Sequence, residues 1–249
     1  LCFFILLLLL SSKYKKVTYS VFFTLLAVLA FGYRSFPRPE MFSCLLLCLF
    51  FYILEDERRS YLLPILQIIW VNMHGYFILG PILVFLYCIG ELISGDKYKA
   101  KKLGVVFLIT SLACFVNPYF YKGAFYPIKV SIDAFMSHKD YNQDIYELMM
   151  PGNSSFRNFI FFWVLAILSS ITFLINLKKA KMQHALIFLG SFVAGYLAIR
   201  NMPVFIFLAM PLAVINLNEA KLTKDIVEKK YYTFFILIIS AVIYFFISN

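Results

Sequence analysis

Long runs of apolar residues, separated by short polar connections, recur along all 249 residues of the chain. A helix that crosses the roughly 30 Å hydrocarbon core of a bilayer needs about 20 such residues. The chain is 62% hydrophobic and only 14% charged, whereas soluble domains are nearer half apolar and a quarter charged. The pattern predicts an all-α fold: a polytopic transmembrane helix bundle of about ten spans, forming a single domain over residues 1–249.

The expected spans follow the apolar runs directly. They lie at 1–11, 17–32, 40–54, 62–73, 76–94, 103–117, 157–177, 184–199, 203–217 and 231–249. The run 62–73 would rise only about 18 Å as a helix, so we expect a half-span or a break inside the membrane. The chain begins at Leu1 inside an apolar run, and we expect an N-terminal part to be missing.

The formal net charge of +10 comes from clusters of Lys and Arg between the apolar runs. Alternate connections, at 12–16, 55–61, 95–102, 178–183 and 218–230, hold 16 of the 23 basic residues. Because basic residues collect in cytoplasmic loops, we expect a multi-pass protein of the cell membrane with these Lys-rich loops in the cytoplasm. We therefore expect the protein to contact the lipid bilayer and not to bind nucleic acid.

The opposite, extracytoplasmic side receives one long connection, residues 118–156. Apolar residues recur within it at roughly helical spacing: Phe125, Ile128, Ile132, Phe135 and Met136. Charged residues lie between them. The connection therefore predicts an amphipathic helix on the membrane surface.

Four groups of polar residues lie at the ends of spans on this outer side. They are Arg34 with Arg38-Pro39-Glu40, Asn72 with His74, Asn117-Pro118-Tyr119 with Glu147, and Arg200 with Asn201. Polar and ionisable groups near membrane depth are costly and usually face a cavity or a partner. We expect all four groups to lie at one level and to be candidates for a site.

Arg200 separates two apolar runs by a turn, 200–202. Its guanidinium is always charged, and its planar set of donors fits a phosphate group. A position at the outer headgroup level suits a lipid-linked phosphate. The alternative is an ordinary interfacial anchor that reaches lipid headgroups.

Two carboxylates accompany the outer basic residues. Glu40 follows Pro39 at the expected start of a span, where the helix dipole favours a carboxylate, and this alone accounts for it. The alternative is a carboxylate that binds metal or acts as a base, with Arg34 and Arg38 binding an anionic substrate. Glu147 belongs either to a solvated loop face or to an acidic lip.

Asn72 and His74 lie at a break between two apolar runs, after Trp70 and before Gly75. Trp is typical of membrane interfaces, so we expect Trp70 to lie there. The break is either a hydrated turn between two helices or a place where Asn72 and His74 donate hydrogen bonds to a substrate sugar or phosphate.

Several motifs of soluble enzymes are absent. The sequence has no GxxxxGK[ST], GxGxxG, HExxH or GxSxG pattern and no set of zinc ligands at suitable spacing. These absences argue against an ATP-driven pump carried by this chain alone. We assign no metal ligands, and the sequence requires no cofactor, although a divalent cation could assist with phosphate charge.

The polar groups belong to stretches that occur in one order along the chain. They are Arg38 to Ser43, Trp70 to Phe77 with Gly80, Asn117-Pro118-Tyr119, Ile145-Tyr146-Glu147, and Arg200 to Phe205 with Pro211. Together they resemble bacterial polyprenyl-phosphate-dependent glycosyltransferases of the GT-C class, the class that contains the protein O-mannosyltransferases. The pattern departs at Phe120, where Gly is usual, and at Leu148, where Trp commonly follows the Glu.

The resemblance implies a membrane glycosyltransferase that moves a sugar from a polyprenyl-phosphate donor to an acceptor at the extracytoplasmic face. Its base is typically an acidic residue of the first outer loop, which would precede Leu1; Glu40 and Glu147 are the candidates within the chain. The residues expected to bind substrate are Arg34, Arg38, Asn72, His74, Arg200 and Asn201.

Three other functions fit parts of the same pattern. A transporter or flippase also has many spans and broken helices, but it predicts polar residues through the membrane midplane. The centres of these runs are nearly free of charge. A non-catalytic membrane assembly subunit and an O-antigen polymerase or ligase are the other two alternatives, since both suit an outward polar face.

Overall fold

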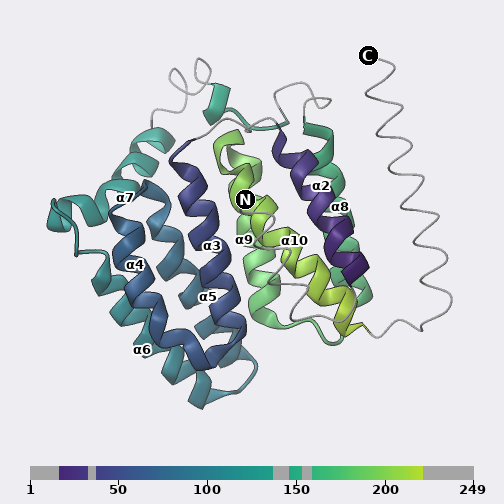
Figure 1. Ribbon diagram of the computed structural model, residues 1–249, viewed down its shortest axis with the longest axis horizontal. Helices are drawn as coiled ribbons and strands as arrows, with labels where there is room; N and C mark the ends of the chain where they lie inside the picture. The colour runs from purple at the N-terminus through teal and green to yellow at the C-terminus, as the bar shows by residue number, and fades with distance from the viewer. Residues whose placement is uncertain (1–16, 33–37, 137–145, 153–158, 221–249) are drawn as a thin grey trace.

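The computed structural model describes residues 17–32, 38–136, 146–152 and 159–220 (Figure 1). Helices account for all of the regular structure in these ranges, and no strand occurs in them. The predicted all-α class is confirmed for this part of the chain. The expected spans at 1–11 and 231–249, and the candidate Arg34, lie outside the described residues.

The described helices follow one another along the chain with short connections. They are α2 (Val17–Phe31), α3 (Glu40–Glu55), α4 (Leu63–Val71), α5 (Leu79–Ile93), α6 (Lys97–Ala113), α7 (Phe120–Met136), α8 (Ile160–Ile175), α9 (Met182–Leu197) and α10 (Met202–Glu219). Short 3-10 helices lie at η2 (Glu57–Leu62), η3 (Gly75–Ile78), η4 (Tyr146–Leu148) and η6 (Ile199–Asn201).

Each of the eight expected spans within the described residues contains a helix, and seven of these helices begin and end within three residues of the predicted run. α4 is short, with nine residues, as expected of the run 62–73. The start of α6 was predicted wrongly. Asp96 Oδ1 accepts a hydrogen bond of 3.0 Å from the Lys99 backbone N–H, so the basic segment 97–102 forms the first turns of α6 rather than a loop.

α10 is the central helix of the bundle. Every residue in 202–217 is buried, because α2, α3, α8 and α9 pack around it (Figure 1). The ring of Phe205 contacts those of Phe162, Phe188 and Phe192, with centroids 5.3–5.6 Å apart. An apolar helix without a polar face is typical of such an interior position.

The helices α3 to α6 form a second packed group beside α10. α5 and α4 pack against α6, and α3 packs against both α4 and α5. The two groups meet where α5 contacts α9 and where α3 contacts α10. Gly90 permits the first of these contacts, because a Cβ there would lie only 2.6 Å from the backbone nitrogen of Gln183.

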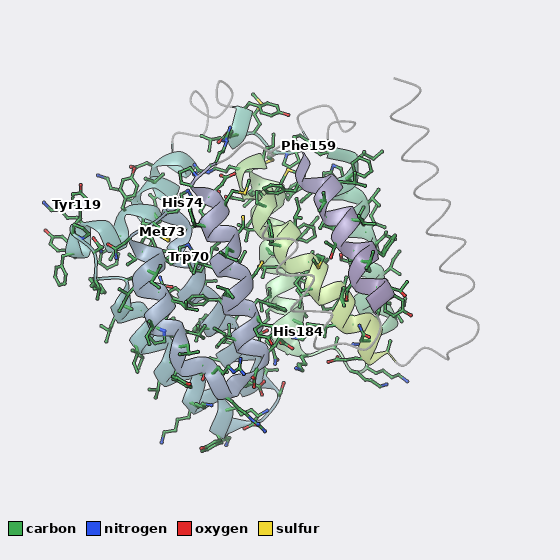
Figure 2. The ribbon with its side chains drawn as sticks, viewed as in Figure 1. Trp70, Met73, His74, Tyr119, Phe159 and His184 are labelled. Carbon is green, nitrogen blue, oxygen red and sulfur yellow. The ribbon has the colours of Figure 1, made fainter. Side chains whose placement is uncertain are left out.

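Apart from α7, which lies across one end, successive helices run in opposite directions, so their termini gather at two ends of the bundle (Figure 1). At one end the start of α3 meets the connection between α4 and α5, where Ser43 Oγ lies 2.9 Å from His74 Nδ1. At the other end the last residue of α3 meets the start of α9, where Glu55 Oε1 lies 2.7 Å from His184 Nε2. We call these the His74 end and the His184 end, and Figure 2 shows the two histidines far apart along the bundle.

The outward faces of the helices carry large apolar side chains. α6, for example, exposes Val105, Leu108, Ile109 and Leu112. Among the described residues, two helices are long and apolar enough to cross a membrane, Gly75–Ile93 and Ile199–Glu219, and the second is 89% buried within the bundle. Shorter apolar helices lie at Thr18–Phe31, Ile160–Ile175 and Met182–Leu197. By length and composition, these helices are consistent with a membrane location.

The helix predicted within 118–156 is present as α7, and its place on the membrane surface stays a prediction. Its residues Ile128, Lys129, Ile132 and Asp133 are exposed, whereas the partly exposed Phe125 packs its ring edge to face on Phe115, with centroids 5.9 Å apart. α7 contacts the bundle at η3. Most of the helix therefore leaves an apolar surface uncovered.

Candidate functional site

The residues expected on the outer side gather at the His74 end from distant parts of the sequence. Arg38, just before α3, forms an ion pair with Glu147 of η4, 109 residues later. Both side chains are about two-fifths exposed, at 42% and 39%. The backbone N–H of Ile199 donates to the Met149 carbonyl oxygen at 2.9 Å, which holds η4 beside η6.

Tyr76 connects the start of α5 with the turn between α9 and α10. Its hydroxyl lies 2.9 Å from the Arg200 carbonyl oxygen and 3.2 Å from Asn201 Oδ1. The Arg200 guanidinium lies over the same ring, with Cζ 5.9 Å from the ring centroid. This contact is a cation–π interaction, and no carboxylate among the described residues pairs with Arg200. A half-buried cation without a counter-ion is suited to binding an anion.

His74 lies between α3 and Tyr76 at the same end. Its Nδ1 is 2.9 Å from Ser43 Oγ, and the ring stacks edge to face on Tyr76 with centroids 4.9 Å apart. Trp70 donates from Nε1 to Ser43 Oγ at 2.9 Å. Trp70 is fully buried inside the protein, where its indole N–H has found an acceptor, and its place at the membrane interface stays a prediction.

Two charges near His74 shift its pKa in opposite directions. Burial lowers the pKa of His74 below its usual value, the Glu40 carboxylate raises it, and the Arg200 guanidinium lowers it further. Glu40 is the first residue of α3 and is itself buried. The imidazole of His74 is therefore neutral at pH 7.

The side-chain amide of Asn72 donates no hydrogen bond to His74 or Arg200. Its Nδ2 donates to the carbonyl oxygens of Ile68 and Val116, both at 2.8 Å, and so ties the end of α4 to the end of α6. Asn117 likewise holds its own turn, with Nδ2 donating to the Cys114 carbonyl oxygen at 2.9 Å. Both amides are used to close helix ends.

Sequence reasoning did not single out Ser43 and Tyr76 as site residues. Each lies within an apolar run or beside one, and each gains its partner from a helix distant in the sequence. The sequence did contain one indication of this cluster: Ser43 is a hydroxyl residue inside an apolar run. A buried hydroxyl needs hydrogen-bond partners.

A second polar cluster lies at the His184 end and was also missed. His184 and Tyr87 both contact Glu55 Oε1, at 2.7 Å each, and Lys181 Nζ lies 3.6 Å from Glu55 Oε2. Gln183 Nε2 donates to Glu91 Oε1 at 2.9 Å. These contacts join the ends of α3 and α5 to the start of α9, and they act as links between helices.

No group of three or more His, Cys, Asp or Glu side chains that could hold a metal ion occurs among the described residues. The His74 end instead offers a cation at Arg200, a neutral imidazole at His74, an amide at Asn201 and two carboxylates. Such a set can bind an anionic group and hydrogen-bond a polar one. The chain matches no protein-family model, no curated protein and no solved structure.

Proposed function

We propose that the chain is a multi-pass membrane glycosyltransferase that resembles the GT-C class. It transfers a sugar from a polyprenyl-phosphate donor to an acceptor at the extracytoplasmic face. In this proposal the whole chain forms one transmembrane domain of about ten spans, with the Lys-rich connections in the cytoplasm. The His74 end is then the outer, catalytic end.

The distribution of charge along the bundle supports this orientation. The basic segment at the start of α6 and Lys181 at the start of α9 belong to the His184 end, where Lys181 pairs with Glu55. Arg38 and Arg200 are at the His74 end. The sequence places three lysines, Lys122, Lys129 and Lys139, in the connections assigned to that side. The exposed apolar residues of α7 suit a helix lying at the outer membrane surface.

The proposal depends chiefly on the position and the charge of the Arg200 side chain. It is a cation held over Tyr76 at one end of an apolar bundle, without a carboxylate partner among the described residues. A polyprenyl phosphate has its chain in the bilayer and its charge at the headgroup level. Arg200 would meet that phosphate at the level where the apolar surface ends.

In the proposed reaction an acceptor hydroxyl oxygen forms a bond to the anomeric carbon of the sugar. The bond between that carbon and the phosphate oxygen breaks, and the phosphate leaves with the electron pair. Arg200 stabilises the departing charge, and a base takes the hydroxyl proton. Glu40 and Glu147 are the candidate bases within the chain, and a divalent cation, if used, would assist at the phosphate.

The test is sugar transfer by membranes that contain the protein expressed from its complete coding sequence. Polyprenyl-phosphate donors carrying different radiolabelled sugars are supplied one at a time, with membranes lacking the protein as the control. The proposal predicts that label leaves the lipid fraction for an acceptor with at least one donor. Absence of transfer from every donor, with the protein folded, would favour a transporter or an assembly subunit.

A further inference from the structure

Ser43 is held between Trp70 and His74 in a place that water does not reach. Ser43 Oγ lies 2.9 Å from Trp70 Nε1 and 2.9 Å from His74 Nδ1. Trp70 is 0% exposed and Ser43 is 2% exposed. These two contacts therefore decide the direction of each hydrogen bond without competition from solvent.

The direction follows from which groups can donate. An indole N–H is only a donor, so Ser43 Oγ accepts from Trp70. The single proton of the Ser43 hydroxyl then has His74 Nδ1 as its partner. If Nδ1 carried a proton instead, the buried hydroxyl would be left without an acceptor, which is costly.

A second donor points at the same nitrogen. The backbone N–H of Tyr76 donates to His74 Nδ1 at 3.4 Å, where His74 begins η3. Because the Ser43 hydroxyl and the Tyr76 N–H both face His74 Nδ1, this nitrogen is a hydrogen-bond acceptor. Burial also lowers the pKa of His74, and a neutral imidazole with an unprotonated Nδ1 carries its proton on Nε2.

We propose that Trp70 and Ser43 hold His74 in the tautomer protonated on Nε2, so that His74 donates a hydrogen bond to a phosphate oxygen of the donor lipid, beside Arg200. The inference rests on the proposed function for the identity of the phosphate. Ser43 and Trp70 are positioning residues, because they act through His74. His74 is then a donor in substrate binding and does not take the acceptor's proton at Nε2.

His74 and Arg200 both contact the Tyr76 ring, and the Arg200 guanidinium is near enough to lower the pKa of His74. The His74 ring and the Arg200 Cζ lie 4.9 Å and 5.9 Å from the centroid of the Tyr76 ring. Among the described residues, Glu40 acts on His74 and Arg38 is paired with Glu147, while α7 brings Lys122, Lys129 and Asp133 to this end. A neutral donor beside Arg200 binds a phosphate oxygen without adding a second cation.

The tautomer is measured directly by NMR of protein labelled with nitrogen-15 histidine, in detergent at pH 7.5. The three histidines are distinguished by comparison with His74→Gln. The inference predicts that His74 is neutral with its proton on Nε2, and that Ser43→Ala gives a mixture of tautomers. A proton on Nδ1, or an unchanged spectrum in Ser43→Ala, would overturn it.

Two further variants keep this test independent of folding. Trp70→Phe removes the indole N–H but keeps an aromatic ring, and it should loosen the tautomer preference. Ser43→Thr keeps the hydroxyl and should preserve the preference. A Ser43→Thr protein that matches Ser43→Ala would contradict the role of the hydroxyl.

The ligand is tested with farnesyl phosphate, farnesol and inorganic phosphate in the same samples. Farnesyl phosphate should move the His74 Nε2 resonance at concentrations where farnesol and inorganic phosphate do not. A shift with inorganic phosphate alone, or no shift with any probe, would overturn the lipid-phosphate role.

Transfer activity separates this inference from the proposed function. Gln places an amide donor near the position of imidazole Nε2, whereas Asn places it near Nδ1, so His74→Gln should retain about tenfold more transfer than His74→Asn. Transfer in wild type with equal losses in the two variants would overturn the donor role alone. No transfer in wild type, with the predicted tautomer and farnesyl phosphate shift, would overturn the glycosyltransferase reaction alone.

Discussion

At the scale of single residues, Phe120 has a backbone conformation that suits glycine. Its φ is 49°, the one positive value among the described residues other than glycine. Asn117 holds the turn, with Oδ1 accepting from the Tyr119 N–H and Nδ2 donating to the Phe120 carbonyl oxygen, both at 2.9 Å. The proposed resemblance to the GT-C class predicts Gly at this position, and the positive φ supplies a physical reason for a glycine there.

The strain at Phe120 is measured by comparing Phe120→Gly with Phe120→Ala. Both variants remove the ring, but only glycine adopts the left-handed region without a steric cost. Phe120→Gly should therefore be more stable than Phe120→Ala by about 1 kcal/mol. Thermal unfolding in detergent checks this difference, and equal midpoints for the two variants would contradict it.

His74 gives the site a defined dependence on pH. Burial holds its pKa below 6.5, so as pH falls the unfolded chain takes up a proton before the folded protein does. Stability should be constant above about pH 7 and should fall as pH drops below the unfolded pKa of about 6.5. The thermal midpoint as a function of pH measures this, with His74→Gln as the control in which this component is absent. A midpoint that rises between pH 7 and pH 5.5 would contradict the sign.

At the scale of elements, the helices could be predicted because apolar runs end at Lys clusters, Pro or Gly. The contacts between helices could not. The sequence did not indicate that Trp70 donates to Ser43, because Ser43 lies on another helix. Glu55 and His184 are 129 residues apart, so nothing local indicates that they meet. The spacing of apolar residues describes one helix at a time. The roles of Trp70, Glu55 and His184 depend on partners that lie on other helices.

The crossing of α5 and α9 depends on the absence of a side chain at Gly90. A Cβ at Gly90 would lie 2.6 Å from the Gln183 backbone nitrogen, whereas a Cβ at Gly190 would meet nothing within 4 Å. Gly90→Ala should therefore lower stability by about 1–3 kcal/mol, because the two helices must separate. Gly190→Ala lies in α9 and should be neutral or slightly stabilising.

Unfolding of the two alanine variants in detergent, followed by circular dichroism, measures this difference. Similar midpoints for Gly90→Ala and Gly190→Ala would show that the close approach of α5 and α9 is not present in the protein.

At the scale of the whole molecule, the gathering of Arg38, His74 and Arg200 at one level was predictable from the alternation of spans. Each apolar run reverses the direction of the chain, so polar residues at every second turn share an end. Their contacts were not predictable. The same reasoning overlooked Glu55 and His184, because each stands alone next to an apolar run.

The proposed topology predicts opposite accessibility for two exposed tyrosines near the two ends of α6. Tyr98 lies in its first turn and is 82% exposed, and Tyr119 lies just beyond its end and is 75% exposed. In a protein without its native cysteines, Tyr119→Cys should react with an impermeant maleimide on intact cells. Tyr98→Cys should react only after the cells are opened. Labelling of both variants from the same side would contradict the membrane orientation.

The central claim is that Arg200 binds the phosphate of a polyprenyl-phosphate sugar donor, and the most direct test is transfer by Arg200→Ala. Arg59→Ala is the matched control, because Arg59 lies in η2, away from the His74 end. Its side chain is exposed, and its Nε lies 3.7 Å from Asp56 Oδ2. At equal expression, Arg200→Ala should lose about 10- to 100-fold in transfer, and Arg59→Ala should be unchanged. Transfer by Arg200→Ala at the wild-type rate would show that Arg200 is an interfacial anchor and would contradict the claim.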